Sequence, residues 1–393
     1  MEPNIRIKGF DGDWEQRSLG DIYTERNERG NDSLQILSVS IHGGVSDGEL
    51  DEEGLGKVVR RSEDKSTYKH VYEGDLVFNM MRAWQGAIGV VKTEGMISPA
   101  YISAIPNESV YPPFMDYVLR RKEAIDQINN LSYGVTDFRK RLYWDSFVKV
   151  KCHLPSVEEQ KCIADTLESL DRYILLNQRQ CDDLKELKKY MLQKMFPKDG
   201  EKVPEIRFAG FEGEWEQRKL GEICLVTMGQ SPDGSTYSET PSDYILVQGN
   251  ADLKDGWVCP RIWTTQKTKT AEAGDLIMSV RAPAGAMGKT SYNVVLGRGV
   301  AGIKGNEFIY QSLIKMDAGG YWKKLAAGST FESINSDVVN GAELLVPQDK
   351  AEQNRIGEYF TNLDSLITHH QRKHDTLLEF KAYLLQNMFP KEV

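Results

Sequence analysis

Two long segments of the chain, 158–196 and 351–389, carry apolar residues at alternating intervals of three and four. This spacing is the a/d seam of a coiled coil, and it continues for about five heptads in each segment. Neither segment contains a proline, but one follows each closing phenylalanine, where proline stops a helix. We therefore predict two helices of about 38 residues, each roughly 57 Å long. The seam positions are Ile163, Leu167, Leu170, Ile174, Asn177, Cys181, Leu184, Lys188, Met191 and Met195, and then Ile356, Phe360, Leu363, Ile367, His370, His374, Leu377, Lys381, Leu384 and Met388.

Polar residues interrupt both seams at matching positions, Asn177 with His370 and Lys188 with Lys381. Polar seam residues lower stability but fix the register of a coiled coil. We expect the two helices to pack antiparallel on each other, with a globular part at each end and a pseudo-twofold axis between them. The alternative is that each helix packs on its own domain. Helix length argues against it, because a domain of about 150 residues is only ~30–35 Å across.

Short apolar runs outside the helices predict β-strands. Turn residues such as Gly43-Gly44 separate them, and a helical stretch over Pro113–Ile128 has a counterpart near Phe308–Met316. The predicted fold class is α+β: two mixed α/β domains in tandem, each followed by a long helix, with the helices packed as an antiparallel coiled coil. The predicted strands are Leu34–Ile41, Asp75–Met80, Gly89–Lys92, Ala100–Ile105 and Val148–Leu154, and in the second half Ile245–Gln248, Asp275–Val280, Val294–Leu296 and Ala342–Val346.

The two halves of the chain are a tandem repeat. Matching positions keep a nearly constant offset along the chain, from Trp14 and Trp215 at the start to Met195 and Met388 at the end. The clearest matches are Trp14-Glu15-Gln16-Arg17 with Trp215-Glu216-Gln217-Arg218, Gly74-Asp75-Leu76 with Gly274-Asp275-Leu276, and Met195-Phe196-Pro197-Lys198 with Met388-Phe389-Pro390-Lys391. We predict domains over 1–155 and 198–347, and helical spacers over 156–197 and 348–393. Because Met195–Lys198 leads into the second half, Met388–Lys391 should lie near the N-terminus.

The middles of the two halves differ much more than their ends. Gln35–Ser40 has little in common with Tyr244–Gly249. A matched scaffold with unlike middles favours two readers of different targets. Simple drift after a duplication is the alternative.

The composition describes an acidic globular protein of 393 residues, too long for one ordinary core. A net charge of −9 counts by itself against a nucleic-acid binder, because binding to phosphates needs clustered cations. Local basic stretches exist, however: 281–304 holds four cations and no acid, and 139–151 holds five cations against Asp145. The charge therefore permits DNA binding and predicts weak binding without a partner.

The remaining composition favours a cytoplasmic protein. Five cysteines form no CxxC pair, which indicates reduced thiols and no zinc site. The N-terminus lacks the apolar region of a signal peptide. No apolar stretch approaches the length that a membrane-spanning helix needs.

The order of these features resembles the specificity subunits of type I restriction–modification systems. The motifs that carry the resemblance occur twice. Each helix opens after Leu/Val-Pro and then Glu-Gln, at Leu154-Pro155 with Glu159-Gln160 and at Val346-Pro347 with Glu352-Gln353, and each closes at Met-Phe-Pro. The second copy has one extra residue between the Pro and the Glu-Gln pair. The Trp-Glu-Gln-Arg-x-Leu-Gly openings also fit, and the resemblance covers essentially the whole chain.

The resemblance implies a division of labour. Each globular domain would read one half of a bipartite double-stranded DNA target, and the helices would hold the half-sites apart. Two modification subunits, which bind S-adenosylmethionine and methylate adenine, would dock on the helices, and ATP- and Mg-dependent restriction subunits would join them. The resemblance implies no catalytic residues, metal or cofactor in this chain.

Motifs that suggest an enzyme are weak. Pro283–Thr290 ends in Gly-Lys-Thr like a P-loop, but Pro283 replaces the first glycine and removes a backbone donor from the phosphate cradle. Tyr111-Pro112-Pro113-Phe114 is similar to the loop of amino-methyltransferases, but tyrosine lacks the carbonyl that accepts amino hydrogens. The six histidines form no compact ligand set; His370 and His374 share a helix face but fall on the seam. An ATPase, a methyltransferase and a coiled-coil adaptor without a DNA role stay open as alternatives.

Candidate DNA-binding residues are polar or cationic side chains in loops at strand ends, since such groups pair with base edges and phosphates. For each, a solvated surface residue is the alternative. Arg82 and Arg281 recur at aligned positions, which favours a shared scaffold role or a phosphate contact. The candidates are Arg82, Trp84, Gln85, Thr136, Arg139, Lys140 and Arg141 in the first half, and Gln230, Ser231, Arg281, Lys289, Arg298 and Thr330 in the second.

Overall fold

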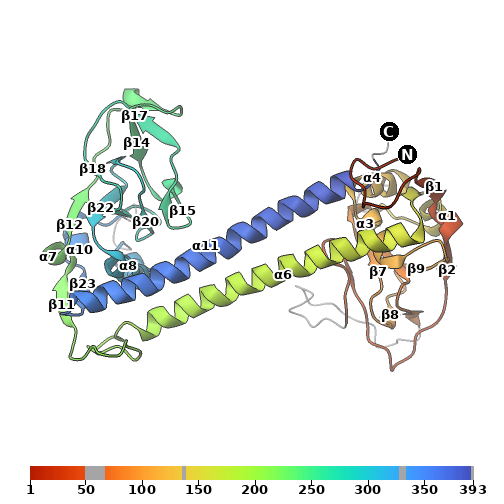
Figure 1. Ribbon diagram of the computed structural model, residues 1–393, viewed down its shortest axis with the longest axis horizontal. Helices are drawn as coiled ribbons and strands as arrows, with labels where there is room; N and C mark the ends of the chain where they lie inside the picture. Colours follow the sequence, from red (N-terminus) through yellow and green to blue (C-terminus); the bar gives the residue numbers. More distant parts are fainter. Residues whose placement is uncertain (49–66, 135–138, 327–332, 391–393) are drawn as a thin grey trace. The chain divides into compact units, whose positions relative to one another are not determined.

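The structure is a computed structural model that describes residues 1–48, 67–134, 139–326 and 333–390. The chain forms two compact units (Figure 1). Unit 1 contains Met1–Leu176 and Lys373–Val393, and unit 2 contains Asn177–Arg372. Each unit therefore combines one globular half with the ends of both long helices, which continue from one unit into the other.

The elements of the first half alternate short strands with short helices before one long helix. They are β1 (Glu15–Ser18), α1 (Leu19–Ile22), β2 (Tyr23–Arg26), β3 (Val39–Ser40), β4 (Gly44–Val45), β5 (Lys69–Val71), β6 (Leu76–Asn79), η2 (Ala83–Gln85), β7 (Ile88–Val90), β8 (Gly95–Ile97), β9 (Tyr101–Pro106), α3 (Pro112–Leu119), α4 (Lys122–Leu131), α5 (Trp144–Phe147), β10 (Lys151–Leu154) and α6 (Val157–Lys194).

The second half repeats this order with additional strands. Its elements are β11 (Glu216–Lys219), α7 (Leu220–Ile223), β12 (Leu225–Met228), η4 (Gly234–Thr236), β13 (Tyr237–Ser238), β14 (Tyr244–Val247), η5 (Asn250–Asp252), β15 (Leu253–Lys254), β16 (Trp257–Val258), β17 (Ile262–Thr264), β18 (Thr270–Ala271), β19 (Leu276–Ser279), β20 (Met287–Lys289), β21 (Val294–Leu296), β22 (Val300–Lys304), α8 (Glu307–Ala318), α9 (Tyr321–Ala326), α10 (Ser336–Asn340), β23 (Glu343–Val346) and α11 (Lys350–Asn387).

The two halves share one sheet topology. Unit 1 has a four-stranded sheet in the order β2-β9-β6-β7, and unit 2 begins its larger sheet with the matching order β12-β22-β19-β20 before adding β16 and β15. Each unit also has one matching two-stranded pair, β1-β10 in unit 1 and β11-β23 in unit 2. The other strands of unit 1, among its described residues, form only the pairs β3-β4 and β5-β8. Unit 2 has instead a five-stranded sheet, β13-β17-β14-β21-β18. Figure 1 places β14 and β17 at the end of unit 2 that lies away from α11. The scaffold next to the helices is therefore repeated, and the outer layer is not.

The long helices and their antiparallel packing are confirmed. Within unit 1, Asp171 of α6 pairs with Lys381 of α11 at 2.5 Å. Within unit 2, Lys188 of α6 pairs with Asp364 of α11 at 2.7 Å. These are the same contact made twice, because the offset that relates Met195 to Met388 also relates one pair to the other. The polar seam residues thus fix the register through ion pairs to acidic neighbours of the seam.

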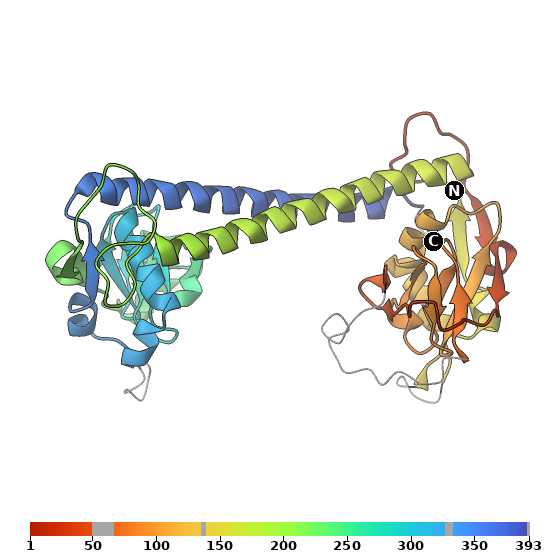
Figure 2. The same cartoon turned by 90° about the horizontal axis from the view of Figure 1, so that it is seen from below.

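The end of each long helix closes the globular half that precedes the other helix. In unit 1 the Phe389 ring stacks on Phe114 at 5.5 Å and meets Trp14 edge-on at 6.0 Å. The matching contacts in unit 2 join the Phe196 ring to Phe308 and to Trp215, at 5.3 and 5.9 Å. The amide of Ile5 donates to the Asn387 carbonyl at 2.9 Å, so the end of α11 does lie beside the N-terminal segment, as predicted (Figure 2).

The Glu-Gln pair at the start of each helix ties the helix to the globular half. Arg6 donates two hydrogen bonds to the buried Glu159 carboxylate, at 2.8 Å each. Arg207 makes the same fork to Glu352 in unit 2, at 2.7 and 2.8 Å. The Glu159 carboxylate raises the pKa of Arg6 above its usual range, because it hydrogen-bonds the charged form. The motif residues noted in the sequence are therefore structural anchors.

Two local predictions were wrong. The strand predicted over Leu34–Ile41 is reduced to Val39–Ser40, which pairs with β4, and to an isolated bridge between Ile36 and Met96 of β8. The single helix predicted over Pro113–Ile128 is two helices, α3 and α4, with an extended residue at Arg121 between them (φ −70°, ψ 152°). An apolar period cannot reveal such a break when no glycine or proline marks it.

Candidate nucleic-acid interface

In unit 1, three candidate residues lie on the turn that follows β6. Arg82 precedes the 3-10 turn η2, which holds Trp84 and Gln85 and ends at Gly86 with φ +105°, a conformation suited to glycine. The Trp84 indole donates to the Met81 carbonyl at 3.0 Å, which fixes its ring against the turn. Arg82 and Gln85 remain exposed. The turn therefore presents a cation, an aromatic edge and an amide together.

The basic segment Arg139–Arg141 lies against the same turn. The Leu142 amide donates to the Met80 carbonyl at 2.9 Å, and Tyr133 and Arg141 exchange two backbone hydrogen bonds. The Lys140 ammonium lies 5.8 Å from the centre of the Trp84 ring and donates to the Asn129 side chain at 2.6 Å. The structure thus brings together two candidate groups that lie far apart in the sequence. Thr136 lies outside the described residues.

In unit 2, Gln230, Ser231 and Arg298 form a second cluster. The Gln230 amide donates to the Leu296 carbonyl at 2.8 Å, and the Arg298 amide donates to the Ser231 hydroxyl at 3.3 Å. Arg281 lies at the same sheet edge, because the neighbouring Val280 amide donates to the Gly299 carbonyl at 2.9 Å. We call Gln230, Ser231, Arg281 and Arg298 the strand-end surface of unit 2.

Arg82 and Arg281 occupy equivalent places in the two units. Each follows the matching strand, β6 or β19. A returning segment contacts the strand end before each turn: Leu142 donates to Met80 in unit 1, and Ile334 donates to Val280 in unit 2, at 3.0 Å. Thr330, which precedes Ile334, lies outside the described residues.

Lys289 is separate from the strand-end surface. It pairs across the sheet with Leu276, at the start of β19, whereas Arg281 follows the end of that strand. Its ammonium pairs with Glu307 at 2.9 Å and lies 4.7 Å from the centre of the Tyr310 ring. Lys289 also ends strand β20, and no helix follows it directly. The apparent P-loop therefore lacks the strand–loop–helix arrangement that cradles phosphates.

The other motifs considered as catalytic are structural. Pro112 and Pro113 begin α3, and Phe114 is fully buried in the core of unit 1. Among the described residues, no group of three or more His, Cys, Asp or Glu side chains could hold a metal ion. None of the described helices is long and apolar enough to cross a membrane.

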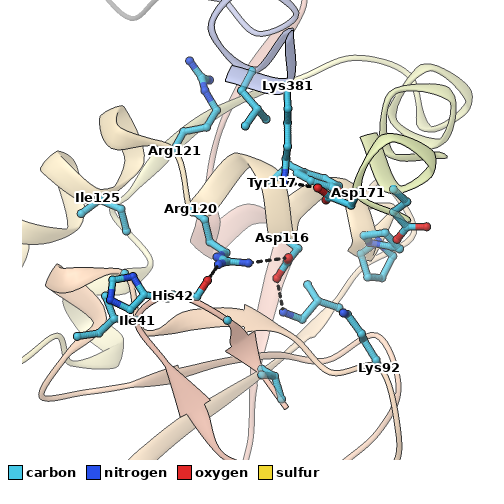
Figure 3. A pocket seen from close by; sticks show the side chains of 18 of the residues that line it. Ile41, His42, Lys92, Asp116, Tyr117, Arg120, Arg121, Ile125, Asp171 and Lys381 are labelled. Carbon is cyan, nitrogen blue, oxygen red and sulfur yellow. Dashed lines mark hydrogen bonds and ion pairs between the residues drawn. The ribbon is translucent and has the colours of Figure 1, made fainter. Parts of the chain in front are cut away.

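Unit 1 also contains a groove of about 1470 Å³, lined by loops of the sheet, α3, α4 and the ends of both long helices. Figure 3 shows two side chains of α3 in this groove, Asp116 on the side of the sheet and Tyr117 beside Asp171 of α6. Asp116 accepts from the Val90 amide at 2.9 Å, and Tyr117 donates to Asp171 at 2.8 Å, next to Lys381. Burial and the Asp171 carboxylate raise the pKa of Tyr117, so its hydroxyl stays protonated.

The groove is a poor site for a polyanion, because five carboxylates offset most of the charge of its six lysines and arginines. The carboxylates are Glu73, Asp116, Glu123, Glu168 and Asp171. Its contacts instead couple the sheet of unit 1 to the helix pair through α3.

The two units therefore share one scaffold and differ in the surfaces that carry the candidate DNA-binding residues. A family model described as "Type I restriction modification DNA specificity domain" matches residues 212–379. The putative type I restriction enzyme MjaX specificity subunit of Methanocaldococcus jannaschii is 26% identical, over 95% of this chain and 92% of that protein.

Two solved structures share the fold. The type I restriction–modification system S subunit from M. genitalium matches with a TM-score of 0.66 and 13% identity, covering 100% of both chains. A chain from a structure concerned with complex assembly and conformational transition of the type I R-M system matches with a TM-score of 0.53 and 23% identity. That match covers 98% of this chain and 100% of the other. Over nearly its whole length the chain is thus similar to a specificity subunit of a type I restriction enzyme, and its second half matches the family's specificity domain.

Proposed function

We propose that each unit of this chain reads one half of a bipartite DNA target, and that the two long helices set the spacing between the half-sites. The observation that carries the proposal is that both units present candidate DNA-binding residues at the same edge of the repeated sheet. Arg82 and Arg281 follow the same strand of the repeated sheet, while the residues around them differ between units. A repeated scaffold with unlike readers suits an asymmetric target with two parts.

The reading residues divide by chemistry. Arg82 and Arg281 recur in both units, so they contact phosphates, which carry no sequence information directly. Gln85, Gln230 and Arg298 differ between units and carry the donors and acceptors that distinguish base edges. Trp84, Arg139, Lys140, Arg141 and Ser231 complete the two surfaces. Lys289 is not part of this interface, because Glu307 already neutralises it.

Two copies of one partner, the modification subunit, dock on the helix pair. The helices expose large apolar side chains at positions related by the same offset as Met195 and Met388: Tyr173 with Leu366, Leu187 with Phe380 and Tyr190 with Tyr383, each 41–53% exposed. Exposed apolar stripes at matching places are typical of interaction surfaces. Leu187, Tyr190 and Leu366 form the stripe of unit 2, and Phe380, Tyr383 and Tyr173 form that of unit 1.

The chain itself carries no catalytic centre in this proposal. S-adenosylmethionine, ATP and Mg would belong to the modification and restriction subunits. These partners also supply phosphate contacts, which offsets the net charge of −9 on this chain.

The test is methylome sequencing of cells that carry this chain with its modification subunit, with and without residues 225–340 exchanged for another recognition domain. We expect a bipartite methyladenine motif in which only one half changes on exchange. A motif indifferent to the exchange would refute the assignment of one reader per unit. ATP hydrolysis or methyl transfer by the purified chain alone would favour an enzyme instead.

A further inference from the structure

A further loop of unit 2, 265–269, lies against the strand-end surface although no sequence motif marks it. The Thr268 hydroxyl donates to the Gln230 carbonyl at 2.7 Å. The Lys269 carbonyl accepts from the Leu296 amide at 2.8 Å, and the Gln266 side chain accepts from the Asp233 amide at 2.6 Å. Backbone and side-chain contacts therefore join this loop to the segments that hold Gln230 and Arg298.

The joined segments are packed backbone against backbone. A Cβ placed on Gly229 would lie 2.1 Å from the Gly297 carbonyl oxygen, and one on Gly299 would lie 2.1 Å from the Gln248 carbonyl oxygen. No side chain fits at such distances. The loops are thus held close together, and the backbone that carries their exposed side chains is fixed by these contacts.

Four cations of this surface are exposed and carry no ion pair with a described carboxylate: Lys267, Lys269, Arg281 and Arg298. Some other cations of the same unit are neutralised, as in the pairs Lys304–Glu272 at 2.5 Å and Arg261–Asp252 at 3.0 Å. One carboxylate, Asp233, lies at the rim, where it accepts from the Ser235 amide at 2.9 Å. The excess positive charge suits a phosphate backbone.

We infer that Lys267 and Lys269 clamp the phosphate backbone of the half-site read by unit 2, beside the base-reading Gln230 and Arg298. The inference rests on the proposed function and adds to it a loop with a defined role. Lysine is a point charge on a flexible stem, which suits phosphate contact better than discrimination between bases. The loop therefore contributes affinity and leaves the recognised sequence unchanged.

The experiment compares the double variant Lys267→Gln/Lys269→Gln with the wild-type chain, each in complex with its modification subunits. Binding is measured over a range of salt concentrations, on an unmethylated duplex that carries the motif found by methylome sequencing. Each phosphate contact contributes about 0.9 to the slope of log affinity against log salt, so we expect the slope to fall by about 1.8. At about 0.15 M salt this corresponds to binding about 30-fold weaker.

The control variant is Lys219→Gln/Lys350→Gln, which removes the same charge from two exposed lysines at the helix end of unit 2. A slope equal to that of this control would overturn the inference, as would a changed methylation motif in the Lys267→Gln/Lys269→Gln variant. If the wild-type complex methylates no bipartite motif, the proposed function fails together with the inference. If the wild-type motif is bipartite and only the slope is unaffected, the inference alone fails.

Discussion

Removing the Phe389 ring should unfold unit 1 before unit 2, although Phe389 lies almost at the end of the chain. Its side chain is 1% exposed, and it packs on Phe114, on Trp14 and under the Arg121 guanidinium, 4.8 Å from the ring centre. Truncating a buried Phe to Ala costs about 3–5 kcal/mol in lost transfer energy and cavity formation. The lost ring contacts are part of this cost, and we expect about 4 kcal/mol for Phe389→Ala.

For a unit of this size, about 4 kcal/mol lowers the melting temperature by roughly 8–16 °C. Hydrogen exchange read by mass spectrometry locates the loss, because local opening raises exchange only where protection is lost. Peptides from β2, β6 and β9 should exchange faster in Phe389→Ala, while those from β12, β19 and β22 should keep their protection.

Two further variants make this prediction specific. Phe196→Ala removes the matching ring and should give the mirrored result, with unit 2 losing protection. Phe380 lies on the long helix that leads to Phe389, but its side chain is 49% exposed. Phe380→Ala should therefore change the free energy of unfolding by less than about 0.5 kcal/mol. Two results would refute the conclusion that the end of α11 completes the core of unit 1. One is a cost below about 1 kcal/mol for Phe389→Ala, and the other is an equal loss of protection in both units.

Three other predictions follow from contacts that the two units repeat. Arg6→Ala leaves the buried Glu159 carboxylate uncompensated and should cost about 3–5 kcal/mol in chemical denaturation, with Arg207→Ala costing a similar amount in unit 2. A circular permutant opened near Gly200, with the original termini joined, should fold and bind its partners, since the end of α11 already lies beside the N-terminal segment; loss of partner binding on size-exclusion chromatography would count against the repeated arrangement. Tyr190→Glu and Tyr383→Glu should each reduce the modification subunits bound from two to one by native mass spectrometry, and unchanged stoichiometry in the double variant would exclude the apolar stripes as the docking faces.

The exposed position of several candidate residues could be predicted from sequence because the turn that holds them is a local feature. Arg82, Trp84 and Gln85 follow an apolar strand and precede a glycine, which predicts an exposed turn. The loop of Lys267 and Lys269 carries no such mark. The pairing of β18 with β21 sets Lys269 opposite Leu296, and Leu296 also contacts Gln230. This long-range pairing therefore brings the loop to Gln230. Lys289 shows the reverse case: its sequence context predicts a loop, and the fold places it in a strand beside Glu307.

The sequence by itself determined the architecture that depends on periodicity and repetition. A seam of mostly apolar residues at intervals of three and four along each long segment favours one regular structure, the coiled-coil helix, and the doubled motifs indicate two similar halves. Tertiary structure alone decided which pieces meet. The end of α11 completes unit 1, the Glu-Gln motif anchors an arginine far away in the sequence, and the loop of Lys267 and Lys269 joins the strand-end surface of unit 2. These contacts join residues distant in the chain, and no local pattern encodes them because their energy comes from burial and pairing in the folded state.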